Sequence, residues 1–281
     1  MTATMAVPNA TDDIELDLLL EALYRFCGYD LRGYSRPSLK RLAQGLLIKH
    51  QLQHISELIP KLAHDEGLRE EIIDGLTVSY SILFRDPEMF NRVRQDVFSY
   101  LKSFPRLSIW VAGCADGEEV FSLAVLLAES GLLGRTRLYA TDINQTALEN
   151  AGSGILQRPL DQECVERYRA SGGQGNLLEY FDQTAAGMQL KPELLKQITF
   201  TRHNLVQEAC HVSAHMILCR NVFIYFDHEL KERVLQKLTD ALIDEGYLAI
   251  GLEENISLCD SYARFNILSR RAGLFRKKAS L

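Results

Sequence analysis

The sequence predicts an α/β protein in which a mostly parallel sheet follows a small all-helical domain. From residue 107 onward, short apolar runs alternate with segments of helical periodicity, and this alternation is typical of helices that connect parallel strands. Residues 14–76, in contrast, show helical spacing of apolar side chains and no strand pattern. We therefore expect two domains, joined by residues 77–106.

The all-helical domain is predicted from apolar side chains that recur three or four residues apart. They run from Leu16 to Phe26 in "IELDLLLEALYRFCGYD", and "RPSLKRLAQGLLIKH", "HISELIPKLAHD" and "GLREEIIDGLT" predict the remaining helices. The preceding residues 1–13 have neither the basic nor the apolar segment of a secretory signal, so we expect a disordered lead-in. In the linking residues, Asp86 and Pro87 predict the start of a helix.

The second domain, residues 107–281, contains the predicted sheet. The strand-like runs are "LSIWVAGC", "RTRLYATDIN", "ITFTRHNL", "HMILCRN" and "GYLAIGL". The helical segments "EEVFSLAVLLAES", "QTALENA" and "HELKERVLQKLTDALID" lie between them, and "FNILSRRAGLFRKK" predicts a closing hairpin. Residues 160–200, approximately, break the alternation and predict a small inserted β-subdomain.

Composition excludes several classes of protein. The net charge of −6 gives no general attraction to nucleic acid, and no apolar run approaches the ~20 residues of a membrane-spanning helix. The six cysteines include no C-x-x-C pair, and no histidine cluster has metal-ligand spacing. We therefore expect a cytoplasmic protein with reduced thiols, no metal site and no insertion into a membrane.

The stretch "WVAGCADGEEVFSLA" is the most informative about a ligand. Its turn from Gly113 to Gly117 matches neither the G-x-G-x-x-G dinucleotide fingerprint nor a P-loop, and Glu118 and Glu119 follow at once. Asp142 ends the next predicted strand, where such sheets place a carboxylate on ribose hydroxyls. A cationic nucleoside without phosphates, S-adenosylmethionine, would suit these acids, although acids there also simply favour a helix N-terminus.

Seven blocks in order give the chain a resemblance to the CheR-type chemoreceptor glutamate methyltransferases over residues 14–270, approximately. They are "GYDLRGYSRPSLKR", "SYSILFRDPEMF", "WVAGCADGEEVFSLA", "YATDINQTALENAGSGIL", "FTRHNL", "LCRNVFIYFD" and "GYLAIGLEENIS". The resemblance implies a helical N-terminal domain, an S-adenosylmethionine domain and an inserted β-subdomain. It implies transfer of a methyl group to receptor glutamates in chemotaxis-type signalling, with S-adenosylhomocysteine as product.

The resemblance also implies roles for individual positions. The residues that stand at the family's cofactor-binding positions are Ser79, Ser81, Arg85, Glu118, Glu119, Asp142, Asn204, Leu205, Arg220 and Asn221. Arg85 and Tyr225 match the catalytic positions and are expected to orient donor and acceptor rather than to exchange protons. The chain departs from the family at Ser79, where an Asn is usual, and at Val120–Phe121, where the family has Pro-Tyr.

The expected partner is the acidic, helical cytoplasmic domain of chemoreceptors, bound by a monomer. The basic residues Arg36, Lys40 and Arg41 of the first domain are candidates for receptor binding, because a basic helix face would steer an acidic helix. Two alternatives stay open: a catalytically weakened CheR-like regulator that binds the cofactor or a signalling partner, and a methyltransferase for a small molecule or another protein. A nicotinamide-dependent oxidoreductase would have the same kind of sheet, but this sequence lacks the glycine fingerprint of that class.

Overall fold

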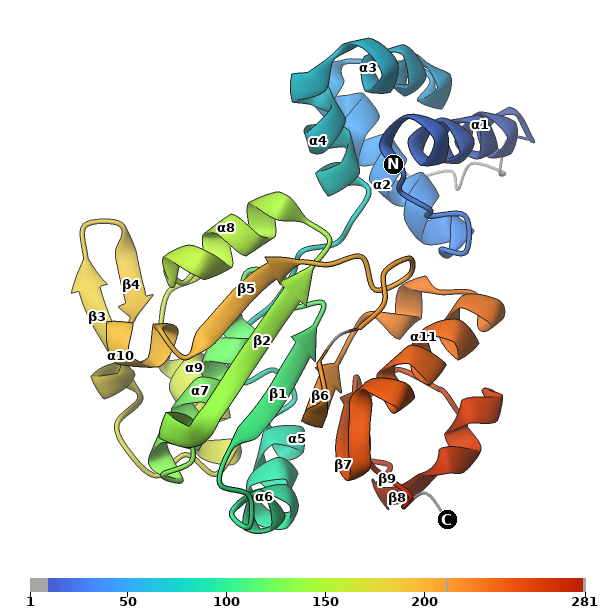
Figure 1. Cartoon of the computed structure of the whole chain (residues 1–281). Helices are drawn as coiled ribbons and strands as arrows, with labels where there is room; N and C mark the ends of the chain where they lie inside the picture. Colours follow the sequence, from blue (N-terminus) through green and yellow to red (C-terminus); the bar gives the residue numbers. More distant parts are fainter. Residues whose placement is uncertain (1–9, 211, 280–281) are drawn as a thin grey trace, which may run out of the picture. The chain divides into compact units, whose positions relative to one another are not determined.

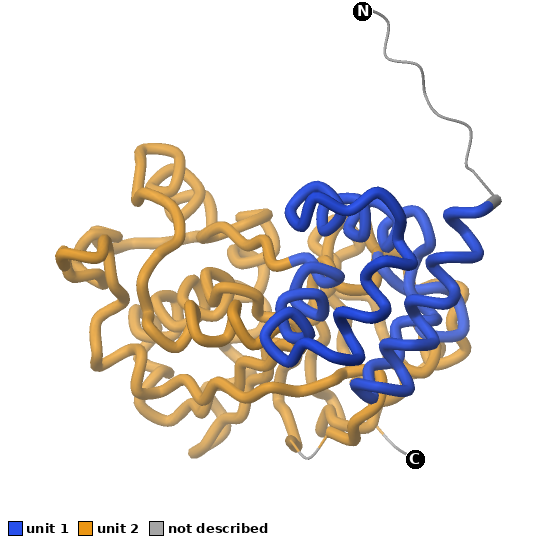
Figure 2. Tube along the Cα trace, turned by 90° about the horizontal axis from the view of Figure 1, so that it is seen from above, with its two compact units in different colours: residues 1–78, 225–230 blue, residues 79–224, 231–281 orange. Residues whose placement is uncertain are grey.

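The computed structural model describes residues 10–210 and 212–279, which form two compact units (Figure 2). Unit 1 holds the chain up to Val78 together with Tyr225–Leu230, and unit 2 holds Ser79–Ile224 and Lys231–Leu281. The segment around Arg85, which the sequence leaves to a linker, thus belongs to the same unit as the sheet.

Unit 1 is all-helical, as expected. Its helices are α1 (Ala10–Cys27), α2 (Arg36–His50), the short η1 (Ile55–Glu57), α3 (Leu58–His64) and α4 (Glu66–Gly75). Leucines at helical spacing are buried in its core, but Phe26, expected in the same stripe, is 56% exposed. Of the expected lead-in, residues 1–9 lie outside the described residues. Residues 10–13 are helical instead, because Asp12 and Asp13 in the first turn suit the positive end of the helix dipole.

A short segment from late in the sequence completes unit 1. The Ser35 N–H donates to the carbonyl oxygen of Tyr225 at 2.6 Å, and the Asp227 N–H donates to that of Gly33 at 2.9 Å. Between these two bonds, the rings of Tyr34 and Phe226 pack edge to face with centroids 5.1 Å apart. Tyr225 is therefore held by its backbone to the loop that precedes α2.

Unit 2 contains the mostly parallel sheet that the alternating pattern predicts (Figure 1). Its strands, in spatial order, are β5 (Ile198–Arg202), β2 (Thr136–Asp142), β1 (Leu107–Ala112), β6 (Ala214–Cys219), β7 (Leu242–Ile250), β9 (Leu274–Lys277) and β8 (Phe265–Ser269). The first five are mutually parallel, and β9 and β8 form the expected closing hairpin. The carboxyl ends of β1, β2, β5 and β6 therefore meet at one edge.

Helices and a small hairpin surround this sheet. The main helices are α7 (Glu118–Glu129), α8 (Gln145–Ser153), α9 (Gln162–Ala170) and α11 (His228–Ala241), with the short α10 (Pro192–Leu195). The linking helix runs as α5 (Pro87–Arg92), a π-helical stretch η2 (Val93–Val97) and α6 (Phe98–Leu101). The inserted hairpin is β3 (Phe181–Thr184) with β4 (Gly187–Leu190), as the break in the alternation predicts.

The end of α11 differs from the sequence expectation. The pattern "DALID" predicts helix to residue 244, but β7 already begins at Leu242, which pairs with Ala214 of β6. Strand pairing between β6 and β7 outweighs the local helical periodicity of this segment. The register then shifts, and Glu245, with a φ of 61°, lies in the irregular stretch before Tyr247 pairs with Met216.

One buried carboxylate ties three segments of unit 2 together. Glu129, in the last turn of α7, accepts hydrogen bonds from the N–H groups of Gln174 and Gly175, both at 3.2 Å. It also pairs with Arg94 of η2 and receives the hydroxyl of Tyr168 of α9. Because its side chain is only 5% exposed, these partners together satisfy a charge that water does not reach.

Candidate functional site

The turn between β1 and α7 has a shape that only glycine permits at two positions. Gly113 and Gly117 have φ angles of 79° and 94°. A Cβ on Gly113 would lie 2.5 Å from Val222 in the loop after β6, and one on Gly117 would lie 2.7 Å from Phe121. The backbone of this turn therefore approaches the neighbouring loop closely at the carboxyl edge of the sheet.

Asp142, at the end of β2, is bonded to this turn. One carboxylate oxygen accepts the N–H of Ala115 at 2.8 Å, and the other accepts that of Asn144 at 3.0 Å. The cap of α8 is Asn144, whose side chain accepts the N–H of Ala147, so Asp142 is not itself the helix cap. Burial raises the pKa of Asp142.

Glu118 opens α7 and is 2% exposed. One of its oxygens is bonded to the hydroxyl of Ser81, whereas Oε1 has no hydrogen-bond partner among the described residues. The hydroxyl of Ser79 is likewise buried and without a partner in that part of the chain. Burial raises the pKa of Glu118. A buried carboxylate oxygen without a partner is costly unless a ligand satisfies it, so Glu118 Oε1 indicates a site for a polar ligand.

Arg220, after β6, links α7 to the segment before α5. Its guanidinium pairs with Glu119 and with Asp86, the latter at 2.6 Å, and donates to the backbone oxygen of Arg85 at 3.1 Å. The side chain of Arg220 is fully buried, so these bonds fix its orientation. Arg220 therefore joins α7 to the segment before α5, a structural role that does not require direct contact with a ligand.

The remaining predicted cofactor positions lie in two turns. Asn204 is 8% exposed, and its side-chain oxygen accepts the N–H groups of Val206 and Gln207 at 3.0 and 3.2 Å, as in a turn after β5. The backbone oxygen of Leu205 accepts from Lys237 of α11 at 3.2 Å. Both residues thus stand at the carboxyl edge with their turn already stabilised.

Glu254 is a residue of this region to which the sequence analysis gives no role. Its buried carboxylate accepts the N–H groups of Gly251 at 2.5 Å, Asn221 at 3.0 Å and Ile224 at 3.3 Å. Asn221 has a φ of 61°, which this anchoring holds in place. The available signal is the acidic pair Glu253–Glu254 shortly after a buried strand, in "GLEENIS".

Two groups of predicted residues belong to unit 1. Tyr225 falls in unit 1, where its backbone oxygen is bonded to Ser35. The proposed receptor-binding residues also lie in unit 1, and two of them are paired with acids of α1: Arg36 with Asp17, and Lys40 with Asp13 at 2.5 Å. Arg41 is exposed.

The cluster in unit 2 can hold a cationic ligand that carries hydroxyl groups. Its acids, Glu118, Glu119 and Asp142, all have a pKa raised by burial, so a positive ligand charge would favour their ionised forms.

Within residues 10–210 and 212–279, no group of three or more His, Cys, Asp or Glu side chains could hold a metal ion. In the same part of the chain, every helix is too short or too polar to cross a membrane.

Comparisons with known proteins give matches to both domains of the chain. Residues 14–77 match the CheR methyltransferase all-alpha domain, and residues 80–272 match the CheR methyltransferase SAM binding domain. A Pseudomonas putida protein named Cher3 is 37% identical over 94% of this chain and 97% of its own length. A chemotaxis protein methyltransferase of Listeria innocua is 31% identical, with 87% and 92% covered, and one of Pseudomonas aeruginosa is 27% identical, with 92% and 95% covered.

Proposed function

Because this chain belongs to the CheR methyltransferase family, whose second domain binds S-adenosylmethionine, we propose that it methylates glutamate side chains of chemoreceptors. The names of the Listeria and Pseudomonas aeruginosa relatives support a role in chemotaxis. The observation that carries the proposal is the orphaned oxygen of Glu118, a residue bonded to Ser81 and next to a turn that has no phosphate-binding signature.

These residues fit the cofactor's chemistry. Glu118 Oε1 would accept from a cationic group, and the hydroxyls of Ser79 and Ser81 would bond its polar end. Each oxygen of Asp142 keeps a lone pair beyond its backbone N–H, so the carboxylate would still accept ribose hydroxyls. When bound, S-adenosylmethionine supplies an electrophilic methyl group on a sulfonium.

The acceptor needs little activation. A glutamate side chain is already ionised at neutral pH, so no general base is required and positioning accounts for most of the rate. Arg220, with Glu119 and Asp86, holds the segment of Arg85 in place, and we assign Arg85 the orientation of the cofactor and Tyr225 that of the acceptor. A strongly charged pocket would not help, because charge is neutralised as the methyl group moves.

Two measurements test the proposal. Calorimetry should show binding of S-adenosylmethionine and S-adenosylhomocysteine, and labelled methyl groups should then appear on receptors in chemoreceptor-containing membranes. Tyr225→Phe should lower turnover and leave cofactor affinity near normal; loss of cofactor binding would show that its assigned role is wrong. Cofactor binding without methyl transfer would favour the alternative of a weakened regulator.

We further propose that the protein works in the cytoplasm as a monomer and meets the receptor's helical domain through Arg36, Lys40 and Arg41. Arg36 and Lys40 form partly exposed ion pairs with Asp17 and Asp13. Breaking each of these pairs, so that the basic side chain can bind a receptor carboxylate instead, would cost only about 0–1 kcal/mol. Charge reversal at Arg36 and Lys40 should weaken receptor methylation more at low salt than at high salt, whereas an unchanged rate would remove this contact from the proposal.

A further inference from the structure

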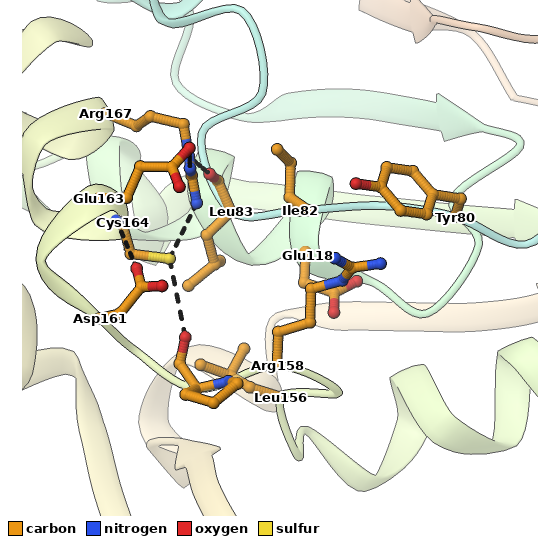
Figure 3. A pocket seen from close by; sticks show the side chains of 11 residues that line it. Tyr80, Ile82, Leu83, Glu118, Leu156, Arg158, Asp161, Glu163, Cys164 and Arg167 are labelled. Atoms are coloured by element: carbon orange, nitrogen blue, oxygen red, sulfur yellow. Dashed lines mark hydrogen bonds and ion pairs between the residues drawn. The ribbon is translucent and has the colours of Figure 1, made fainter.

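A pocket of about 250 Å³ lies beside Glu118 in unit 2 (Figure 3). Its walls come from three segments: the extended residues around Tyr80, the turn that carries Leu156 and Arg158 after α8, and the start of α9 around Cys164. It shares only Glu118 with the predicted cofactor residues, so most of its lining has no role in the function proposed above.

Three of the charged side chains in this pocket are satisfied by their own neighbours. Asp161 accepts the N–H of Cys164 at 2.9 Å and so caps α9. Arg167 pairs with Glu163 at 2.5 Å and donates to the backbone oxygen of Leu83 at 2.9 Å. These groups fix the pocket wall, and a ligand would gain little from them.

Arg158 is different. It is exposed, and across the described part of the chain no carboxylate lies within ion-pair distance of it. Its guanidinium lies over the ring of Tyr80, 4.4 Å from the centroid, and Figure 3 shows it reaching toward that ring in front of Glu118. The guanidinium of Arg85 lies 5.9 Å from the same ring. Tyr80 is 48% exposed, so two guanidinium groups lie near one accessible aromatic ring.

We propose that Arg158 and Tyr80 bind an acidic side chain of the acceptor protein near the glutamate that is methylated. A guanidinium held over an aromatic ring is restricted in its orientation and can present two donors to one carboxylate. The protein as a whole is acidic, with a net charge of −6. The unpaired guanidinium of Arg158 gives this pocket a positive charge instead, and that charge would attract an acidic partner to this place. The inference rests on the proposed function, because it assumes a protein acceptor.

The test compares Arg158→Gln with Arg137→Gln in the full-length protein. Arg137 is also exposed and also lies in unit 2, but it stands at the start of β2, at the opposite edge of the sheet. Initial rates are measured with labelled S-adenosylmethionine over a range of concentrations of chemoreceptor-containing membranes, and cofactor affinity is measured separately by calorimetry.

Arg158→Gln should raise the KM for the receptor about fivefold at low salt, with kcat and cofactor affinity unchanged, and the effect should shrink as salt is added. Arg158→Lys, which keeps the charge but loses the planar stacking, should fall between Arg158→Gln and wild type. Arg137→Gln should match the wild type throughout.

Three results would overturn the inference, and they are distinguishable. If Arg158→Gln weakens cofactor binding and leaves the receptor KM unchanged, the carboxylate bound here is the cofactor's own. If Arg158→Gln and Arg137→Gln behave alike, the pocket does not recognise the acceptor. If the wild type binds cofactor but methylates no receptor, the proposed function itself fails and this inference fails with it.

Discussion

Replacing Glu254 by Gln removes one negative charge from beneath the loop after β6 and keeps the side chain's shape. A Gln oxygen in the place of Oε2 would still accept from Gly251 and Asn221, but as neutral hydrogen bonds. Its NH2 group would then face the N–H of Ile224 and leave that donor unsatisfied. An unsatisfied buried donor costs about 1–3 kcal/mol, and the lost charge assistance adds about 1 kcal/mol for each of two bonds.

Part of this loss is offset. Burial raises the pKa of Glu254, so the ionised carboxylate is itself disfavoured in the folded state, and the amide avoids that cost. We therefore expect Glu254→Gln to lower the free energy of unfolding by about 2–3 kcal/mol. The sign of the pH dependence follows. Because the folded pKa of Glu254 is raised, the wild type loses stability as the pH rises through the unfolded and then the folded pKa, whereas Gln does not titrate. The difference from wild type should therefore shrink as the pH rises.

Urea unfolding followed by the fluorescence of Trp110 measures the effect. Trp110 is the single tryptophan, is 1% exposed and lies in β1, so its signal reports unit 2. The exposed neighbour Glu253 supplies the control, because Glu253→Gln makes the same change in solvent. Cofactor affinity should fall in Glu254→Gln only, since the loop also carries Arg220. Equal stability and equal affinity in the two variants would refute this reasoning.

Three further changes have expected outcomes. Cofactor binding should release protons and weaken as the pH is lowered, because burial raises the pKa of Glu118 and a cationic ligand favours its ionised form. Calorimetry in buffers of different ionisation enthalpy measures the proton release, and a release of zero would contradict this expectation. Glu129→Gln should lower the free energy of unfolding by about 3 kcal/mol, since Arg94 would lose its ion-pair partner, and a urea midpoint equal to wild type would refute that role. Gly117→Ala should reduce both the thermal midpoint and cofactor affinity, because its φ is 94° and the new Cβ would press on Phe121; unchanged values would show that the turn adapts.

Periodicity was sufficient to predict the fold because it is a local property. Strand and helix patterns from residue 107 onward correctly placed the parallel sheet, and the irregular stretch before β5 correctly located the small hairpin. The errors lie at boundaries, where contacts distant in sequence decide: Leu242 joins β7 because Ala214 is there to pair with it.

The candidate site was predicted less completely, because its partnerships cross the sequence. The resemblance assigns cofactor roles to Glu118, Arg220 and Asp142, and the structure adds what each of them touches. No local pattern shows that Arg220 is held by Glu119 and Asp86. Nor does one show that Glu254 accepts two backbone N–H groups from a loop some 30 residues earlier, in addition to that of nearby Gly251. The same holds for the basic residues of α2, because their ion pairs with acids of α1 form only when the two helices pack and are not evident from the sequence.

Unit 1 is assembled from two stretches of chain, and the second, Tyr225–Leu230, is synthesised roughly 150 residues after the first ends. At ribosomal rates of about 5–20 residues per second, the loop before α2 waits on the order of 10–40 s for the backbone partners of Gly33 and Ser35. During translation, the helical unit therefore reaches its final form only after four strands of the sheet have been made.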